Sequence, residues 1–506
     1  MTKGKVYLVG AGPGAPGLIT VKGLDCLKRA DVIIYDHLLD DSLLNAAAPD
    51  AEKIYVGKTP KYHAKEQDEI NQLLVGKAQQ GKIVVRLKGG DPFVMGRGGE
   101  EAEALVANHI PFEVVPGVSS ALAVPAYAGI PVTHRRLASS FTVVTGHEAV
   151  DKEESTIAWD KVAGGADTLV ILMGIGNLAK IVDQLIKNGK SSSTPVALIR
   201  QGTSQKQQTL VGNLGDIVAQ AEKNGFEPPA VIVVGEVVRL HDRLRWFNNR
   251  PLFGKRILVT RAQHQASRLS RLLMECGAVP VEMPVIKITP PNWGELDQAI
   301  LNLKSYHWIV FTSVNGVEAF FRRLYALNLD ARWFNGIRLG VIGPATARAL
   351  GERGLRPDYL PERYTSRGFL AKLSSQDIAG CQVLLPRAHI ASNELTEGIT
   401  ALGGKVHQVT AYRTVAATEA TSQGRQMLLS GEIDIVTFTS SSTVTGLVAI
   451  MGPEWQAINQ AKVACIGPKT AVAAAEAGLK VDIVAKEHTI LGLVEAIEQY
   501  FQGGRK

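Results

Sequence analysis

The sequence has 506 residues, of which 45% are hydrophobic and 20% charged, the composition of an ordinary globular protein of about two to four domains. Its formal net charge of +7 is uneven, because residues 1–250 carry +1 and residues 251–506 carry +6. Only 6% of the residues are aromatic and no basic run alternates with them, so a small polycarboxylate is a better candidate ligand than nucleic acid.

The chain lacks the sequence features of exported, membrane-spanning and metal-binding proteins. The N-terminal MTKGKVYLVGAGPG runs directly into a strand pattern, which is not the pattern of a signal peptide. No apolar run reaches the ~20 residues that cross a bilayer. The four scattered cysteines have no metal-ligand spacing. They predict reduced thiols in a cytoplasmic protein that binds no metal.

A glycine-rich loop, GAGPGAPG, follows the first expected strand at residues 6–9. It fits a loose dinucleotide-binding pattern, with Asp36 at the end of the next strand pattern, VIIYD. A nicotinamide site of that kind needs a helix that opens at the glycines, and Pro16 would interrupt it. The helical pattern instead begins near Thr20. We therefore reject the dinucleotide interpretation.

A second glycine-rich loop, RLKGGDPFVMGRGGEE, spans residues 86–101 between a strand pattern and a helical pattern. In α/β sheets such loops lie beyond the carboxyl ends of the strands, where ligands bind. Glycine allows close approach of the backbone, Asp91 adds an acceptor, and Arg97 adds a planar cation. The later segments VVPGVSSA, LMG and QGTS add further loops of the same kind.

With these loops, residues 6–246 resemble the tetrapyrrole methyltransferases, and within them the uroporphyrinogen-III C-methyltransferases. VYLVGAGPG, VIIYDHLL, YVGK, RLKGGDPFVMGRGGEE, GIPVTHR and VTGH occur in that family's order. The resemblance implies two α/β subdomains, S-adenosylmethionine bound between them and converted to S-adenosylhomocysteine, and a homodimer formed through this half. The cofactor contacts that it implies are Pro13, Gly89, Gly90, Asp91, Val94, Ser119, Ser120, Met173 and Gly202.

The same resemblance implies catalytic and substrate-binding residues. Asp36 would be the general base and Lys58 a proton donor. Arg97, Arg135 and Arg136 would grip substrate carboxylates through paired hydrogen bonds. Without the family, Asp36 at a strand end would be interpreted as a turn or cap residue, and Lys58 as a solvated lysine.

Some of these positions also have a purely structural interpretation. Ser119 and Ser120 could cap a helix, and Met173 could be a core methionine. The first loop departs from the family, which commonly has an acidic residue where Ala15 stands here. We expect this to loosen a loop contact without affecting Asp36 or Lys58.

A polar segment broken by proline, residues 248–251, predicts a linker between domains at residues 1–247 and 252–506. The second domain repeats itself at offsets of 126, 127 and 124 residues: GKRILVTRA recurs as GCQVLLPRA, FTSVNGVEAF as FTSSSTVTGL, and IGPATARALGERGL as IGPKTAVAAAEAGL. Each unit alternates strands and helices, which predicts a parallel α/β lobe made twice. Ser/Thr-rich loops at helix starts suit carboxylates in a cleft between two lobes.

FTS, IGPATARAL, TAYRTV and IGPKTA give residues 255–501 a resemblance to uroporphyrinogen-III synthase. That family implies two lobes joined by paired connecting segments, so a lobe need not be contiguous in sequence. It implies Tyr412 as general acid and Thr312, Ser313 and Thr470 as substrate-binding residues. Without the family, Tyr412 would be a half-buried strand tyrosine.

Together the resemblances predict a bifunctional enzyme of two α/β domains, a two-subdomain methylase followed by a two-lobed synthase. The synthase would close hydroxymethylbilane to uroporphyrinogen III with inversion of ring D. The methyltransferase would then methylate C2 and C7 to give precorrin-2, which could enter sirohaem or cobalamin biosynthesis. The alternative is a methyltransferase fused to a non-catalytic, ligand-binding regulatory module.

Overall fold

The computed structural model describes residues 4–37, 39–57, 67–146, 157–261, 263–373, 375–417 and 422–503. The chain divides into two compact units, Met1–Gly254 and Lys255–Lys506. The segment that we predicted as a linker, residues 248–251, lies near the end of the first unit. The assignment of separate activities to residues 1–247 and 252–506 stays a prediction.

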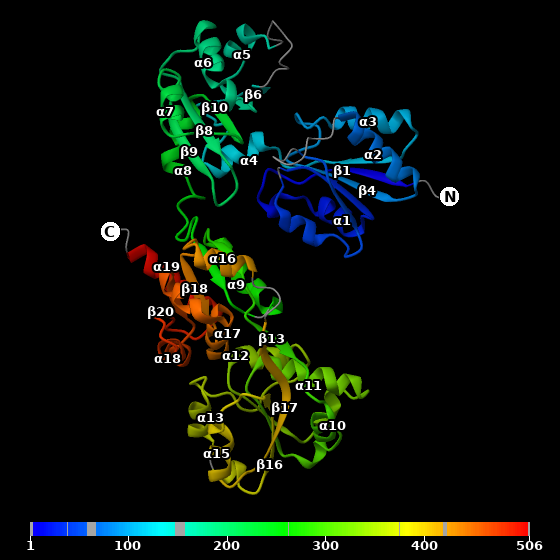
Figure 1. Cartoon of the computed structure of the whole chain (residues 1–506), viewed down its shortest axis with the longest axis vertical. Helices are drawn as coiled ribbons and strands as arrows, with labels where there is room; N and C mark the ends of the chain where they lie inside the picture. The colour runs from blue at the N-terminus through cyan, green and yellow to red at the C-terminus, as the bar shows by residue number, and fades with distance from the viewer. Residues whose placement is uncertain are drawn as a thin grey trace. The chain divides into compact units, whose positions relative to one another are not determined.

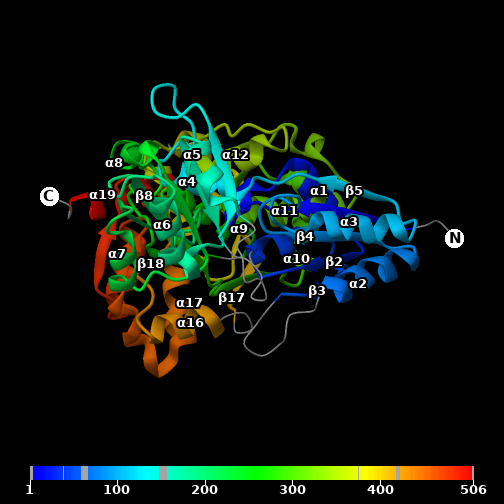
Figure 2. The same cartoon turned by 90° about the horizontal axis from the view of Figure 1, so that it is seen from above.

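The first unit begins with a fully parallel sheet in the order β3-β2-β4-β1-β5. Its strands are β1 (Lys5–Gly10), β2 (Val32–Tyr35), β3 (Glu52–Tyr55), β4 (Ile83–Lys88) and β5 (Phe112–Val115). Its helices are α1 (Val21–Arg29), α2 (Gln67–Gln79) and α3 (Gly98–Ala107), with short 3₁₀ turns at Pro16–Leu18 and Asp41–Ala46. Helix α4 (Ser120–Tyr127) follows β5 and packs against the second sheet. Helices α2 and α3 lie side by side over one face of the sheet, and α1 covers the other (Figure 1 and Figure 2).

Helix α1 begins where the sequence predicts. The side chain of Thr20 accepts a hydrogen bond from the backbone N–H of Gly23 at 3.0 Å, which satisfies one free donor of the first turn. Cys26 and Leu27 then pack against the sheet. This confirms that the glycine loop does not open directly into a helix, because Pro16 first forms a separate short turn.

The second sheet of this unit is mixed, in the order β6-β7-β10-β8-β9. Only β6 and β7 pair in parallel, whereas the other neighbours are antiparallel. The strands are β6 (Phe141–Thr145), β7 (Thr168–Leu172), β8 (Pro195–Arg200), β9 (Gln208–Asn213) and β10 (Ala230–Val234). The helices are α5 (Trp159–Gly165), α6 (Leu178–Lys187), α7 (Ile217–Lys223) and α8 (His241–Leu244), with 3₁₀ turns at Ile175–Asn177 and Glu236–Leu240.

The second unit contains two more five-stranded sheets. The first is parallel, in the order β12-β11-β18-β19-β20: β11 (Arg256–Val259), β12 (Val279–Glu282), β18 (Ile435–Phe438), β19 (Lys462–Cys465) and β20 (Val481–Val484). The other has the order β13-β17-β16-β14-β15: β13 (Ile286–Thr289), β14 (Trp308–Phe311), β15 (Arg338–Val341), β16 (Gln382–Ala388) and β17 (Lys405–Ala416). Its edge strand β13 is antiparallel to β17, and the remaining pairs are parallel.

Helices follow most of these strands. They are α9 (Gln263–Glu275), α10 (Gly294–Leu301), α11 (Val314–Ala326), α12 (Pro344–Gly351), α13 (Ser366–Lys372), α14 (Ser375–Ile378), α15 (Glu394–Ala401), α16 (Ser422–Leu429), α17 (Ser441–Met451), α18 (Pro468–Glu476) and α19 (Ile490–Gly503). Three 3₁₀ segments complete the described part of this unit, at Leu303–Ser305, Ala331–Phe334 and Gly452–Gln460. The predicted α/β fold class is therefore confirmed in both units.

The sequence repeats do not each form a lobe, which corrects the simplest interpretation of them. The repeated opening strands are β11 and β16, and the repeated FTS strands are β14 and β18. Strand β11 pairs with β18, and β16 pairs with β14, so each sheet combines strands of both repeats. The chain leaves the first sheet before β13 and returns after β17, and these two strands pair with each other.

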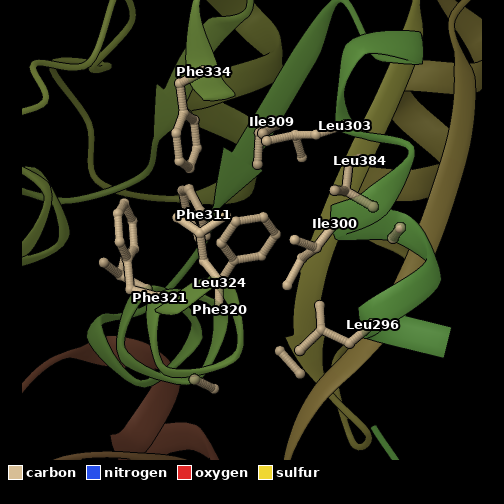
Figure 3. Packing of buried hydrophobic residues seen from close by; sticks show 14 of the residues in the cluster. Leu296, Ile300, Leu303, Ile309, Phe311, Phe320, Phe321, Leu324, Phe334 and Leu384 are labelled. Carbon is tan, nitrogen blue, oxygen red and sulfur yellow. The ribbon is translucent and has the colours of Figure 1, made fainter. Parts of the chain in front are cut away.

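The sheet that contains β14 packs against an aromatic core. Phe311 of β14 meets Phe320 and Phe321 of α11 and Phe334 of the following 3₁₀ segment, and all four are nearly inaccessible to solvent (Figure 3). The rings of Phe321 and Phe334 stack with their centroids 5.4 Å apart. This core anchors α11, whose first turn carries part of the site described below.

In the part of the chain that the structure describes, no helix combines the length and the hydropathy that a membrane span requires.

Candidate functional site

The first unit contains a cavity of about 500 Å³, formed by loops that follow strands of both its sheets. Seven of the nine residues predicted to contact the cofactor line it: Pro13, Gly89, Gly90, Val94, Ser120, Met173 and Gly202. The remaining lining is mostly apolar or backbone: Met95, Gly96, Val124, Leu172, Ile175, Gly176, Ile199, Gln201, Pro228, Pro229, Ala230 and Val231. Residues far apart in the sequence thus meet in one mostly apolar hollow.

Backbone strain concentrates around this cavity. Met95, Met173 and Gln201 line it and have φ values of +54°, +55° and +46°. Arg97 and Thr203, in the same loops, have φ values of +57° and +69°. Residues other than glycine rarely adopt this left-handed conformation, and such strain gathers at functional sites because the surrounding structure must hold it in place.

Three loops of the first sheet touch backbone to backbone beside the cavity. A Cβ atom on Gly117 would lie 2.2 Å from the carbonyl oxygen of Gly90, and one on Gly10 would lie 2.5 Å from Cα of Gly117. Glycine is therefore required at these contacts. The side chain of Asp91 reinforces the arrangement by accepting hydrogen bonds from the N–H groups of Phe93, at 2.8 Å, and Gly117, at 3.0 Å.

The two remaining predicted cofactor residues, Asp91 and Ser119, are absent from the cavity lining. Asp91 already accepts the two backbone hydrogen bonds just described. Ser119 is buried and caps α4 by accepting from the N–H of Ala121 at 3.2 Å. Both residues hold the loops in place, and direct contact with a cofactor stays a prediction for each.

The atypical Ala15 takes part in a contact between the two subdomains of this unit. Its backbone N–H donates to the hydroxyl oxygen of Thr203 at 3.1 Å. Thr203 is itself held by Gln207, whose side-chain oxygen accepts from the Thr203 N–H at 2.9 Å. The first glycine loop is therefore fastened to the loop after β8, although no acidic side chain is present at position 15.

The predicted substrate-binding arginines occupy different positions. Arg97 lines a neighbouring hollow of about 500 Å³, which shares Met95 and Met173 with the first cavity. Its guanidinium is exposed and pairs with Glu100 at 3.3 Å. Arg135 and Arg136 are exposed on a tight turn and line neither hollow. The structure thus places one of the three arginines beside the cavity.

The predicted base, Asp36, follows β2 directly and is partly exposed. Its Oδ2 accepts a hydrogen bond from the guanidinium of Arg86 at 3.2 Å. Its Oδ1 is buried and has no hydrogen-bond partner among the described residues. Lys58, the predicted proton donor, lies outside the described residues.

In the second unit, Tyr412 of β17 is 8% exposed and contacts a residue that the sequence also singled out. Its hydroxyl lies 3.0 Å from the hydroxyl of Ser313, which also caps α11 by accepting from the N–H of Gly316 at 3.1 Å. Burial raises the pKa of Tyr412, whereas hydrogen bonds with Ser313 and Asn315 and the charge of Arg387 oppose that rise. The phenol therefore keeps its proton at neutral pH and is a donor.

Tyr412 also lines a hollow of about 290 Å³. The other lining residues come from β13, the start of α10 and α11: Ile288, Thr289, Pro290, Trp293, Asn315, Glu318, Ala319 and Arg322. Thr312, which follows β14, is partly exposed beside Ser313. Thr470 is buried in the first turn of α18, next to the other sheet of this unit. The structure thus joins Tyr412 to Ser313 and places Thr470 in the other lobe.

Comparisons with known proteins assign each half. A family model described as tetrapyrrole (corrin/porphyrin) methylases matches residues 5–218, and one described as uroporphyrinogen-III synthase HemD matches residues 267–495. The chain is 40% identical over 498 residues to the porphyrin biosynthesis protein HemD of Ruminiclostridium josui, covering 98% of each protein. The chain belongs to both families.

Two relatives match the methylase half alone. The uroporphyrinogen-III C-methyltransferase of Methanocaldococcus jannaschii is 59% identical over 240 residues, which cover 47% of this chain and 98% of that protein. An S-adenosyl-L-methionine-dependent uroporphyrinogen III methyltransferase of Methanosarcina barkeri is 54% identical over 241 residues, covering 48% and 94%. Together with the two family models, these relatives confirm the resemblances that the sequence motifs indicated for the two halves.

Sequence reasoning missed a buried arginine in the synthase half. Arg387 of β16 is 4% exposed, donates to the side chain of Gln408 at 3.3 Å, and acts electrostatically on Tyr412. Burial lowers its pKa and also that of Arg261, which occupies the equivalent place in the first repeat. The shared arginine in VTRA and LPRA was an available signal.

In the methylase half, sequence reasoning missed three charged residues behind Asp36: Arg86, Lys88 and Glu101. All three stand in the long glycine-rich motif, but nothing in their spacing shows that they are buried.

Proposed function

We propose that the synthase half closes hydroxymethylbilane to uroporphyrinogen III with inversion of ring D. The methylase half then transfers methyl groups from S-adenosylmethionine to C2 and C7 of that product, which gives precorrin-2. The observation that carries the proposal is the cavity of the methylase half, because it gathers seven predicted cofactor residues from separate loops. The two named methyltransferase relatives support the same activity for this half.

The cavity suits S-adenosylmethionine in size and chemistry. Its volume of about 500 Å³ lies within the range of small-molecule sites, roughly 300–1,000 Å³. Gly89 and Gly90 allow backbone groups to approach the polar parts of the ligand. Met173, with about half of its surface exposed, offers a soft, apolar contact for a sulfonium.

The residues of the methylase half would align the substrate and remove a proton. S-adenosylmethionine supplies the methyl group when it is bound. Arg97 would hold a substrate carboxylate beside the shared wall of the two hollows. Asp36 would accept the proton that the tetrapyrrole loses after methylation, and Lys58 would act as a proton donor to the substrate.

In the synthase half, Tyr412 would donate its proton to the departing hydroxyl group of hydroxymethylbilane, which leaves as water. Ser313 would orient the phenol through the contact at 3.0 Å. Arg387 would stabilise the phenolate that remains, because its buried charge acts on Tyr412. Thr312 and Thr470 would hold substrate carboxylates through hydrogen bonds.

Incubation of the purified chain with hydroxymethylbilane, with and without S-adenosylmethionine, tests both activities. We expect the type III isomer alone in the first case and a dimethylated product in the second. Type I product from spontaneous closure would show that the second half is not a synthase. That result is expected if this half is a non-catalytic regulatory module. Addition of uroporphyrinogen III then tests the methylase half separately.

We further propose a homodimer through the methylase half and a cytoplasmic location, without a nucleic-acid partner. Exposed apolar side chains of this half outside the two hollows, Leu122 and Phe141 among them, are available for contact with a second copy. Light scattering coupled to size exclusion would measure the mass: about twice the 54.3 kDa of one chain supports a dimer, and one chain mass overturns it.

A further inference from the structure

Two cations interrupt the apolar face of the first sheet. Val84, Arg86 and Lys88 alternate along β4 and therefore point to the same side, toward α2 and α3. Val84 packs there in an ordinary apolar core. Arg86 and Lys88 are each only 4% exposed. Buried cations are costly unless they are paired, so their partners explain their presence.

Glu101 of α3 is the shared partner. Its side chain is completely buried, and its Oε1 accepts hydrogen bonds from Nε of Arg86 at 3.0 Å and Nζ of Lys88 at 2.7 Å. Gln67 of α2 adds a long contact to the same oxygen at 3.5 Å. One carboxylate oxygen thus holds two cations on neighbouring positions of one strand face.

Arg86 extends this chain of charges to Asp36. While Nε binds Glu101, one terminal nitrogen donates to Oδ2 of Asp36 at 3.2 Å. The other terminal nitrogen donates to the backbone oxygens of Ile34, at 3.4 Å, and Leu87, at 3.2 Å. Because all three nitrogens of the planar group are engaged, its orientation is set from both sides. Asp36 is then held through Oδ2, and Oδ1 remains as the acceptor without a partner among the described residues.

We propose that Arg86, Lys88 and Glu101 are positioning residues for methyl transfer, a buried chain of ion pairs that aims Asp36 at the substrate. This inference rests on the proposed function, in which Asp36 removes a proton. The neighbouring position on this face, Val84, is covered by apolar packing, so burial of the face does not by itself explain the charges at positions 86 and 88. If these residues served the fold alone, their replacement would change stability but leave kcat of the folded enzyme unchanged.

Asp36 interacts with titratable groups on two strands of the first sheet, β3 and β4. The described titratable groups that act on or are acted on by Asp36 are Arg86, Lys88 and Tyr55. Burial lowers the pKa of Lys88, and the charge of Arg86 adds to this effect, whereas Glu101 and Asp36 oppose it. Arg86 is the one described cation that donates directly to Asp36, so its replacement removes the hydrogen bond that holds Oδ2.

The test compares Arg86→Gln, Arg86→Lys and Glu101→Gln in the full chain, with kcat and KM measured for the methylation of uroporphyrinogen III. Glu52→Gln is the matched control, because it breaks an exposed ion pair of 2.7 Å with Lys77 in the same subdomain. Binding of S-adenosylhomocysteine by calorimetry shows whether each variant retains the folded cavity. The variant Asp36→Asn tests the base assignment itself.

We expect kcat to fall about tenfold to hundredfold in the three network variants, because small misplacement of a reacting group has effects of this size. KM and the cofactor affinity should change less than about threefold, and the control should match the wild type. Arg86→Lys keeps the charge but loses the planar group that binds Glu101 and Asp36 at the same time, so its kcat should fall as well.

The outcomes separate this inference from the proposed function. If the wild-type chain does not methylate, the proposed function fails. If Asp36→Asn methylates at the wild-type rate, Asp36 is not the base, and the positioning role is overturned with it. If Asp36→Asn is inactive but the network variants retain kcat, only the positioning role is overturned. Should a glutamine variant fail to fold, Arg86→Lys still decides through kcat.

Discussion

Replacing Tyr412 by Phe removes one hydroxyl group and keeps the aromatic ring in a nearly solvent-free site. The folded state loses the hydrogen bonds of this hydroxyl with Ser313 and Asn315, each of which contributes on the order of 1 kcal/mol to the free energy of unfolding. Ser313 keeps its bond to the N–H of Gly316, so the start of α11 should stay intact. The change is therefore mild for the fold.

The effect on synthase activity should be much larger. A positioned general acid contributes about 10²- to 10⁴-fold, which corresponds to roughly 3–5 kcal/mol of activation barrier. Because burial raises the pKa of Tyr412, the hydroxyl should stay protonated to above pH 10, and Tyr412 should produce no alkaline loss of rate below that value.

The assay is the rate of type III isomer formation from hydroxymethylbilane, followed by separation of isomers. Tyr306→Phe is the matched control, because Tyr306 is a buried tyrosine of the same lobe that is hydrogen-bonded to His407 and does not line the hollow. It should lose similar stability and retain its activity. If Tyr412→Phe keeps more than about a third of the wild-type rate, the general-acid role is refuted.

Three further predictions concern the first unit. Gly117→Ala should weaken S-adenosylhomocysteine binding more than about tenfold in calorimetry, because the new Cβ would lie 2.2 Å from a backbone oxygen; Gly164→Ala, with open space around it, should bind normally. Thr203→Val should raise the dissociation constant about threefold to tenfold, since the Ala15 N–H loses its acceptor; unchanged binding would show that this contact does not shape the cavity. Glu113, held by Lys22 and Lys5, has a pKa lowered from 4.5 to about 2, so its stabilising effect is present above pH 4.5 and is lost as the pH falls toward 2. Thermal melts of Glu113→Gln should accordingly lie below the wild type at neutral pH and converge with it near pH 2, and a constant gap would contradict the ion-pair explanation.

Local signals allowed the sequence to predict the elements around the cavity. Thr20 was recognisable as a helix start because the capping hydroxyl acts within three residues. Strand-to-helix loops at residues 10–17 and 89–97 were recognisable from glycine and proline next to apolar runs. The family resemblance then supplied which of these loops face a cofactor, which local physics alone does not determine.

What the sequence could not supply depends on contacts between distant segments. Ser313 and Tyr412 are 99 residues apart, and their contact follows from the order of β14, β16 and β17 in the sheet. Burial of Arg86 and Lys88 depends on Glu101, which α3 places over β4. A charged residue at a strand end is usually solvated, so only the three-dimensional partner reveals the exception.

The pairing of β11 with β18 and of β16 with β14 also limits how the synthase half could have arisen. A protein with a single repeat would hold an opening strand and an FTS strand, each of which pairs here with a strand from the other repeat. Two such chains would complete both sheets by exchanging their opening segments, as a domain-swapped dimer does. If the two copies were joined end to end, the exchanged segments would become the two connections between the lobes, which here contain the paired strands β13 and β17. Neither repeat alone could then be deleted without unfolding both lobes.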